Sequence, residues 1–161
     1  MTSTRDLAAL ARRLIDTSRY MVLGTVDPDG RPRVSPVYYA PDGYQLLYWL
    51  SSPEAHHSRN LAEHPEVSMV VFDSAAPIGA GQAVYLIARA EQVPDADLEG
   101  CADVACRARF PEQDVFPIDK LRHPAPLRLY RAHITEHSVH IRGSDPVHGR
   151  GVDHRMTVTL T

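Results

Sequence analysis

The sequence predicts a mostly β fold with flanking helices, in which six antiparallel strands close into a small barrel. Runs of β-branched and aromatic residues alternate with short turns that contain proline, aspartate and glycine, which is typical of hairpins. Closure is favoured because it removes the unpaired edges that an open sheet exposes. With 161 residues and 43% hydrophobic side chains, the chain can bury one core without disulfides or metal.

The first element is predicted as a helix over residues 4–17. Ser3 stands at the N-cap position, and Leu7, Leu10 and Leu14 recur with helical spacing, so the apolar residues share one face. We expect this amphipathic helix to lie across the sheet.

Three strands are expected next, as an antiparallel meander. Residues 20–26 form the first strand, and residues 27–30 place a proline and a glycine where a tight turn needs them. Residues 34–39 form the return strand, and a second turn at 41–43 leads into a third strand over 44–50.

A helix of about ten residues is predicted to follow. Ser51 and Ser52 stand ahead of Pro53 as hydroxyl caps, and His64-Pro65 ends the helix. The remaining predicted elements are strands at 67–72 and 83–92, a mobile loop at 73–81, a helix from Pro94-Asp95 to Phe110-Pro111, and one or two closing strands within 127–141.

This pattern predicts a single domain over residues 1–142 and a polar tail over 143–161 that either covers a binding site or is loosely ordered. No apolar run approaches the roughly 18 residues of a membrane helix, and the N-terminus lacks the apolar segment of a signal peptide. A cytoplasmic location follows as an expectation.

Composition argues against several functions. A net charge of −3 offers no general attraction to nucleic acid or to an anionic membrane. Cys101 and Cys106 match neither a redox pair nor a zinc motif. Lys120 is the only lysine in the sequence, so a cofactor held as a lysine Schiff base is not expected.

The first candidate site is the point where the third strand ends and a helix begins. Ser51 and Ser52 supply hydroxyl groups, and His56, His57 and Arg59 bring potential positive charge near the free backbone N–H groups of the helix start. Such groups are typical of a phosphate-binding site. The alternative is that the serines only cap the helix and the histidines are solvated.

The second candidate site is the strand before it. Pro32 and Pro36 break the strand ladder, which leaves unpaired backbone groups that can hydrogen-bond a planar heterocycle. Arg33 can reach an anion. The alternative is that the prolines protect an edge and Arg33 is solvated.

No metal site is expected. His133, His137 and His140 have helical spacing, but their neighbours favour a strand, in which His140 faces away from the other two. The sequence contains no G-x-S-x-G motif, Rossmann glycine motif or P-loop. No catalytic residue is therefore assigned.

The order and spacing of these features resemble the pyridoxamine 5′-phosphate oxidase-like family of FMN-binding split barrels. The resemblance rests on residues 22–37, Ser51-Ser52, Arg59-Asn60-Leu61 and residues 64–68, and it covers residues 5 to 141. It implies a six-stranded antiparallel split β-barrel, usually a homodimer with the flavin at the subunit interface.

For the cofactor phosphate, the resemblance implies a place near the two serines and the following helix, with Arg33 as the family's strand arginine. Where relatives carry two basic residues before the Arg-Asn-Leu segment, this chain has His56 and His57. Imidazole is mostly neutral at pH 7, so we expect weaker or pH-dependent cofactor binding, with Arg59 as a compensating cation.

For the flavin ring, the resemblance implies contacts with the backbone of Val34, Ser35 and Pro36, and Gln82 lies close to a position that often contacts the ring. The implied function is that of an FMN-dependent oxidoreductase that passes hydride between the flavin and a small planar substrate. Relatives also use the deazaflavin F420 or bind haem, so an F420-dependent reductase and a non-catalytic flavin- or haem-binding protein are the alternatives.

Overall fold

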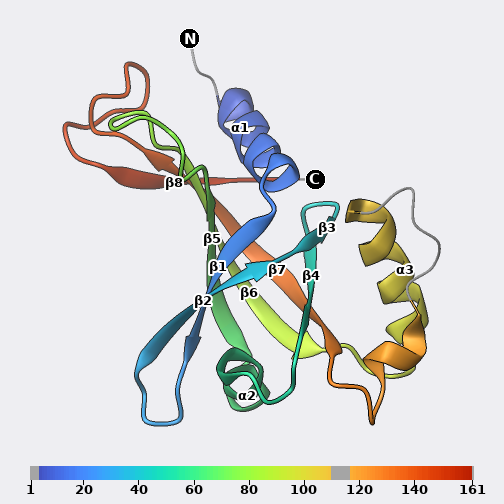
Figure 1. Ribbon diagram of the computed structural model, residues 1–161. Coiled ribbons are helices and arrows are strands. Elements are labelled where there is room, and N and C mark those ends of the chain that lie inside the picture. Colours follow the sequence, from blue (N-terminus) through green and yellow to red (C-terminus); the bar gives the residue numbers. More distant parts are fainter. Residues whose placement is uncertain (1–3, 110–116, 161) are drawn as a thin grey trace.

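The computed structural model describes residues 4–109 and 117–160, which form a curled antiparallel sheet with flanking helices (Figure 1). The helical elements are α1 (Thr4–Thr17), α2 (His56–Glu63), α3 (Leu98–Arg109) and the 3-10 turn η1 (Ile118–Leu121). The strands are β1 (Tyr20–Val26), β2 (Pro32–Tyr38), β3 (Ala40–Asp42), β4 (Leu46–Ser51), β5 (Glu66–Phe72), β6 (Ala83–Gln92), β7 (Arg128–Ile141) and β8 (His154–Val158).

The sheet curls because its two end strands are neighbours in the sequence. The strand order is β2-β1-β5-β6-β7-β4-β3, with β8 paired to β7. β2 and β3 therefore stand at opposite ends of the ladder, although only Tyr39 separates them along the chain. The sheet must bend to bring these ends together, and no ladder joins β2 to β3. The predicted split β-barrel is confirmed.

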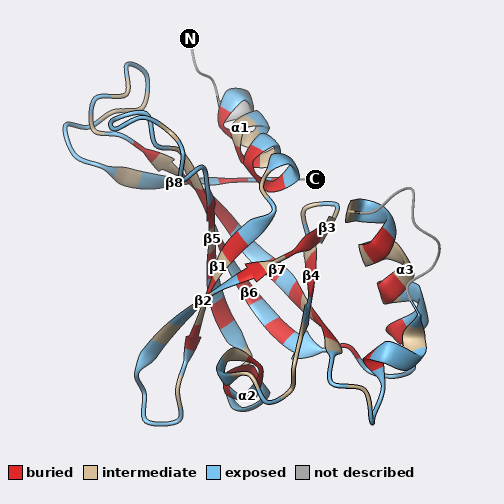
Figure 2. Ribbon diagram, viewed as in Figure 1, coloured by how far each residue is buried: buried red, intermediate tan, exposed pale blue. Residues whose placement is uncertain are grey.

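Two apolar cores hold this sheet, one on each face, and Figure 2 shows buried residues along the strands and the helices that cover them. The larger core lies inside the curl, where Leu23 and Val71 of the sheet pack in one cluster with Leu14 and Ile15 of α1. The smaller core lies between α3 and the other face of β3, β4 and β7, around Tyr48. Each strand between them alternates side chains from one core to the other.

The predicted meander is wrong in its third strand. β4 pairs with β3 and β7, not with β2. The chain bends at Tyr39 and continues as the short strand Ala40–Asp42, so the turn lies at 43–45, where Gly43 has a φ of +55°. Together β3 and β8 bring the strands of the described residues to eight, where six were predicted.

The second helix begins later than predicted. α2 starts at His56, and its N-cap residue Ala55 has no side-chain capping bond. Ser51 ends β4, and Ser52 Oγ accepts a hydrogen bond from the Glu54 backbone N–H at 3.1 Å. The serines therefore build the strand end and the turn, and neither caps the helix.

The C-terminal half follows the prediction in type and departs from it in bounds. α3 starts at Leu98, after the predicted Pro94-Asp95 start, and the closing segment is one continuous strand, β7. β8 pairs with β7, and Leu160, beyond β8, is 1% exposed, so residues 154–160 of the predicted tail pack onto the sheet. The predicted cap Ser3 and helix end Phe110-Pro111 lie outside the described residues.

Candidate functional site

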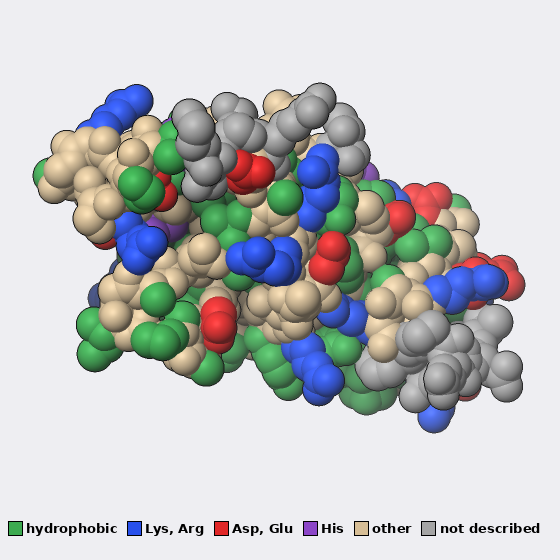
Figure 3. Space-filling view, turned by 90° about the horizontal axis from the view of Figure 1, so that it is seen from above, with side chains coloured by type: hydrophobic (Ala, Val, Ile, Leu, Met, Phe, Trp, Pro, Cys, Tyr) green, Lys and Arg blue, Asp and Glu red, His purple; other side chains and the backbone are tan. Residues whose placement is uncertain are grey.

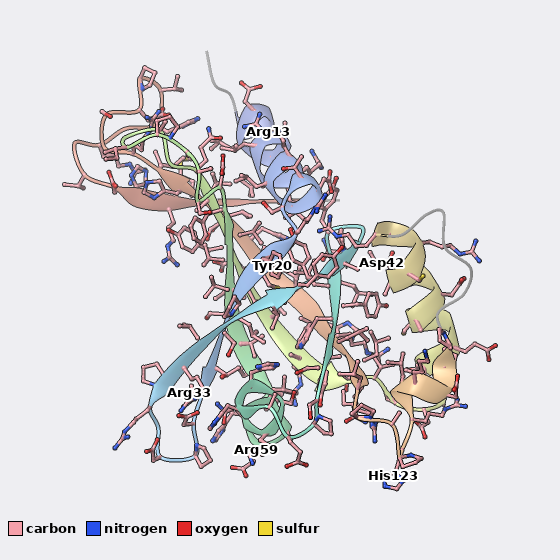
Figure 4. The ribbon with its side chains drawn as sticks, viewed as in Figure 1. Arg13, Tyr20, Arg33, Asp42, Arg59 and His123 are labelled. Atoms are coloured by element: carbon pink, nitrogen blue, oxygen red, sulfur yellow. The ribbon has the colours of Figure 1, made fainter. Side chains whose placement is uncertain are left out.

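Most of the predicted site residues meet at one end of the barrel, where α2 packs against β1 and β2 and contacts the end of β4. Figure 4 shows Arg33 of β2 and Arg59 of α2 at this end of the molecule. These residues meet because the β1–β2 hairpin turn and the turn before α2 both lie at this end of the sheet.

Arg33 is held by a carboxylate of its own hairpin. Its Nε donates to Asp27 Oδ1 at 2.8 Å, and its Nη2 donates to Asp27 Oδ2 at 2.7 Å. Asn60 of α2 donates to Asp27 Oδ1 at 2.7 Å and to Thr25 Oγ1 at 3.1 Å. The hydrogen bond from Arg33, followed by that from Asn60, lowers the pKa of Asp27 to about 2. The positive charge of Arg33 is thus balanced within the protein.

Ser51 and His57 form a second polar pair across the start of α2. Ser51 Oγ and His57 Nε2 share a hydrogen bond of 2.8 Å. Burial, and then the neighbouring His56, lower the pKa of His57, so its imidazole is neutral at pH 7. His56 is exposed and stands one helical turn before Asn60, on the side of Asp27.

Arg59 points mostly to solvent. Its side chain is 57% exposed, and the nearest carboxylate is that of Glu54, at 3.9 Å. An exposed pair at this distance contributes little to stability and is screened by salt. Both predicted arginines therefore face a carboxylate, one tightly and one loosely.

An apolar cavity of about 330 Å³ lies beside this polar end, between the β2–β4 region of the sheet and α3. Leu50, the neighbour of Ser51, is part of its wall. The cavity is lined by Tyr38, Ala40, Tyr48, Trp49, Leu50, Ala102, Ala105, Cys106, Arg109, Leu121 and Leu129. Its volume is within the range of small-molecule pockets.

Among the described residues, the one charged side chain of that wall is already engaged. Arg109 donates to the backbone oxygens of Tyr39 at 2.7 Å and Ser18 at 2.6 Å, and its guanidinium lies over the Tyr39 ring at 4.9 Å from the centroid. The cavity therefore suits an uncharged, flat, apolar group.

The predicted ring contacts on β2 lie outside this cavity wall. Val34 is 70% exposed and lines a groove on the outer face of the sheet, together with Val22, Ile87 and Arg155. Tyr38, at the end of the same strand, is the β2 residue that reaches the cavity.

Gln82 lies at the other end of the protomer. It accepts a hydrogen bond from Arg13 of α1 at 3.0 Å. Gly24, next to Thr25 of the polar end, pairs with Ser68 of β5, which in turn pairs with Ile87 of β6. Ile87 is five residues from Gln82, a distance of about 16 Å along the strand. The apolar core under α1 fills the space between Gln82 and the polar end.

Arg128 is a residue that sequence reasoning missed. In the ladder between β4 and β7, Ser51 lies opposite Arg128. This pairing brings the backbone of Arg128 next to the predicted phosphate site. The two residues are far apart in the chain, and no local motif marks Arg128. Only the pairing of β4 with β7 reveals it.

Beyond Arg59, a groove of about 400 Å³ runs between α2 and the end of β6. We call it the α2–β6 groove. Arg59 and Arg89 both line it, as do Ser58 and Tyr130. The α2–β6 groove is thus an open groove lined by two arginine side chains.

Metal ligands do not gather within residues 4–109 and 117–160: no group of three or more His, Cys, Asp or Glu side chains there could hold a metal ion. On β7, His133 is exposed, whereas His137 is buried and bonded to the Tyr44 carbonyl oxygen at 2.7 Å. Among the helices of those ranges, none has the length and apolar character to span a membrane.

A model of a known protein family matches most of the chain. Residues 7–140 match the family described as pyridoxamine 5′-phosphate oxidase. The chain belongs to the pyridoxamine 5′-phosphate oxidase family. The match spans every strand from β1 to nearly the end of β7, so the family covers the whole polar end and the cavity. No curated protein matches the sequence.

Solved structures with this split-barrel fold differ in what they bind. HutZ, a haem storage protein from Vibrio cholerae, is 26% identical with a TM-score of 0.61, over 77% of this chain and 87% of that one. An F420 reductase is 25% identical with a TM-score of 0.56, over 79% and 94%. A FAD-binding protein from Mesorhizobium loti is 23% identical with a TM-score of 0.61, over 82% and 92%. Proteins with this fold therefore include a haem storage protein, an F420 reductase and a FAD-binding protein.

Proposed function

We propose that this protein is an FMN-dependent oxidoreductase that binds the flavin phosphate at the start of α2 and the flavin ring in the adjoining cavity. The observation that carries the proposal is the Ser51–His57 pair, 2.8 Å apart, at the end of β4, whose opposite face lines an apolar cavity of about 330 Å³. A polar, hydrogen-bonding end beside an apolar slot matches a ligand with one anionic end and one flat ring.

The residues of the polar end fit a phosphate group. Ser51, Ser52 and His57 offer hydrogen bonds, and the backbone N–H groups at the start of α2 add donors. Arg33 and Arg59 bring guanidinium groups to this end, with Arg33 shared with Asp27 and Arg59 mostly exposed, and the side chain of His56 is exposed beside them. When bound, the flavin supplies the hydride transfer, and the protein supplies position and electrostatics.

The cavity residues hold and shield the ring in this proposal. Tyr48 and Leu50 from β4 and Ala105 from α3 give it apolar walls that keep water out. Residues 34–36 lie outside the cavity wall, so in this proposal their backbone faces only the part of the ring that extends beyond the cavity on the β2 side. A small planar substrate lies over the exposed ring face.

The site is completed by a second subunit. Within one protomer the apolar core separates Gln82 from the polar end, so Gln82 contacts a ring only if it comes from the partner. The outer face of β1, β2, β5 and β6 carries exposed apolar side chains, among them Val34 and Ile87, which suit burial against another copy. We therefore propose a cytoplasmic homodimer in which the part of the predicted tail that precedes β8, residues 143–153, covers the partner's site.

Cofactor titration tests the proposal. FMN, F420 and haem are added separately to the purified protein, and absorbance and flavin fluorescence are recorded. We expect FMN to bind, and Ser51→Ala to weaken FMN binding about tenfold because one hydrogen bond to a charged group is lost. Ser74→Ala, on the 73–81 loop, is the matched control. A protein that binds none of the three cofactors contradicts the proposal.

An F420-dependent reductase is the second candidate, and the α2–β6 groove favours it. F420 carries a long anionic tail beyond its phosphate, and Arg59 and Arg89 line a path for such a tail. Arg89 shares its charge with Glu66. If F420 is the cofactor, it binds more tightly than FMN, and Arg89→Gln weakens F420 binding without changing FMN binding.

A flavin- or haem-binding protein without activity is the third reading, supported by the likeness to the haem storage protein. Turnover separates it from both reductases. A bound flavin that cycles between its oxidised and reduced forms with a reductant and an acceptor excludes a purely storage role.

A further inference from the structure

We propose that Arg128 supplies the permanent positive charge that holds the cofactor's phosphate beside Ser51. This inference rests on the proposed function and adds to it a binding residue from β7. It does not depend on whether the phosphate belongs to FMN or to a longer flavin.

Strand pairing places Arg128 on the same face as Ser51. Residues directly opposite each other in an antiparallel pair project their side chains to the same side. The neighbouring same-face pair demonstrates this here, since the rings of Trp49 and Tyr130 stack with centroids 5.8 Å apart. Arg128 and Ser51 are the next same-face pair along these strands, at the end nearest α2.

The guanidinium of Arg128 is anchored before any ligand arrives. Its Nη1 donates to the carbonyl oxygens of Ala125 at 2.7 Å and Leu127 at 2.6 Å. The side chain is half-buried. An anchored planar guanidinium loses less conformational freedom when it binds an anion than a free one does.

Charge balance identifies Arg128 as the cation that the phosphate needs. Arg33 is neutralised by Asp27 at 2.7 Å, and Arg59 is mostly exposed beside Glu54. His57 is neutral at pH 7 because burial lowers its pKa. No carboxylate among the described residues lies within ion-pair distance of Arg128.

Other charged groups on this side do not cancel Arg128. Glu54 affects the same Tyr130 phenol as Arg128 does, but its side chain is 83% exposed and therefore screened. His56 lies close enough to lower the pKa of both Asp27 and His57, but an imidazole is not a permanent cation. A phosphate between Ser51, His57 and Arg128 therefore meets one permanent positive charge.

The test compares FMN with riboflavin, which lacks the phosphate. We expect Arg128→Gln to weaken FMN binding about 10- to 100-fold, the size of a lost charge-assisted hydrogen bond, and to leave riboflavin binding unchanged. Arg128→Lys should recover part of the FMN affinity. Arg122→Gln, whose guanidinium also donates to a backbone oxygen, is the matched control and should bind FMN as the wild type does.

The outcomes separate this inference from the proposed function. If the wild-type protein binds neither FMN nor F420, the proposed function fails. If the wild type binds FMN and Arg128→Gln binds it equally well, or loses FMN and riboflavin affinity to the same extent, the inference on Arg128 is wrong. If Arg128→Gln does not fold, Arg128→Lys tests the inference instead. A ratio of FMN to riboflavin affinity and a salt dependence of FMN binding that both equal those of the wild type contradict the inference.

Discussion

The Asp27–Arg33 pair determines how much charge the polar end offers to a ligand. The two residues are six apart and stand on either side of a tight turn, so hairpin pairing alone brings them together. The sequence identified Arg33 as a residue able to reach an anion. It did not identify its competitor, because the bidentate contact depends on the strand register, which sets Thr25 opposite Arg33.

Asp27→Asn should free Arg33 for a ligand. We expect tighter binding of FMN and of inorganic phosphate, because the variant no longer neutralises the guanidinium. The pKa of Asp27 is lowered to about 2, so its ion pair stabilises the fold above pH 4 or so. This contribution is lost as the pH falls through about 2. Phosphate titrations, and urea unfolding at several pH values, measure the two effects.

Two results for Asp27→Asn would contradict these expectations. Unchanged or weaker phosphate binding means that Arg33 does not contact the anion. A stability difference from the wild type that persists below pH 2 means that the lost contribution is not that of the ion pair.

His57 should make cofactor binding depend on pH. Burial lowers its pKa, and a bound phosphate raises it because the anion stabilises the imidazolium. Binding then takes up a proton, so FMN affinity should rise as the pH falls from 8 to 6. Dissociation constants at each pH measure this, and His57→Gln should flatten the profile. The exposed His133→Gln is the control; a profile that His57→Gln leaves unchanged assigns the dependence to another group.

At the scale of elements, local patterns predicted type better than boundaries. The hydroxyl groups of Ser51 and Ser52 match a helix cap in sequence, yet α2 begins at His56. Ser51 is drawn into β4 because β7 offers it a ladder partner. The same long-range pairing turns Ala40–Asp42 into a strand, where the proline and glycine nearby predicted only a turn.

The contribution of the C-terminal strand β8 and its flank to stability can be seen only in the folded structure. Leu160 is 1% exposed, and its carbonyl oxygen accepts a hydrogen bond from Gln45 at 2.7 Å. We expect Leu160→Ala to lower the free energy of unfolding by about 2–5 kcal/mol, as for other buried leucines. Leu127→Ala, at a partly exposed position, should cost far less. Chemical denaturation measures both, and equal small effects indicate that β8 and its flank contribute little.

At the scale of the whole molecule, the curled sheet leaves one apolar face open. Seen from above in Figure 3, hydrophobic side chains are interspersed with charged ones. On the outer face, Val34 is 70% and Ile87 41% exposed. A second copy is the occupant we propose, because Gln82 can complete the flavin site only from another subunit.

Ile87→Glu should break the homodimer. A buried, unpaired carboxylate is costly at an apolar interface, so the mass measured by light scattering should fall from twice 17.9 kDa to 17.9 kDa. FMN affinity should fall with it, because the site loses its partner. Ile78→Glu adds the same charge on a fully exposed loop residue and should keep the wild-type mass. A wild type that is already a monomer contradicts the proposal outright.

The sequence by itself determined the family and, apart from β3 and β8, the kinds of element and their order. Turn residues and apolar periodicity act locally, and each strand or helix carries its own signal. The tertiary structure alone decided which strands pair, and with that which side chains meet. Ser51 faces Arg128 only because the bend at Tyr39 carries the chain from one edge of the sheet to the other and sets β4 against β7. Register between distant segments depends on the closure of the whole sheet, so no local pattern contains it.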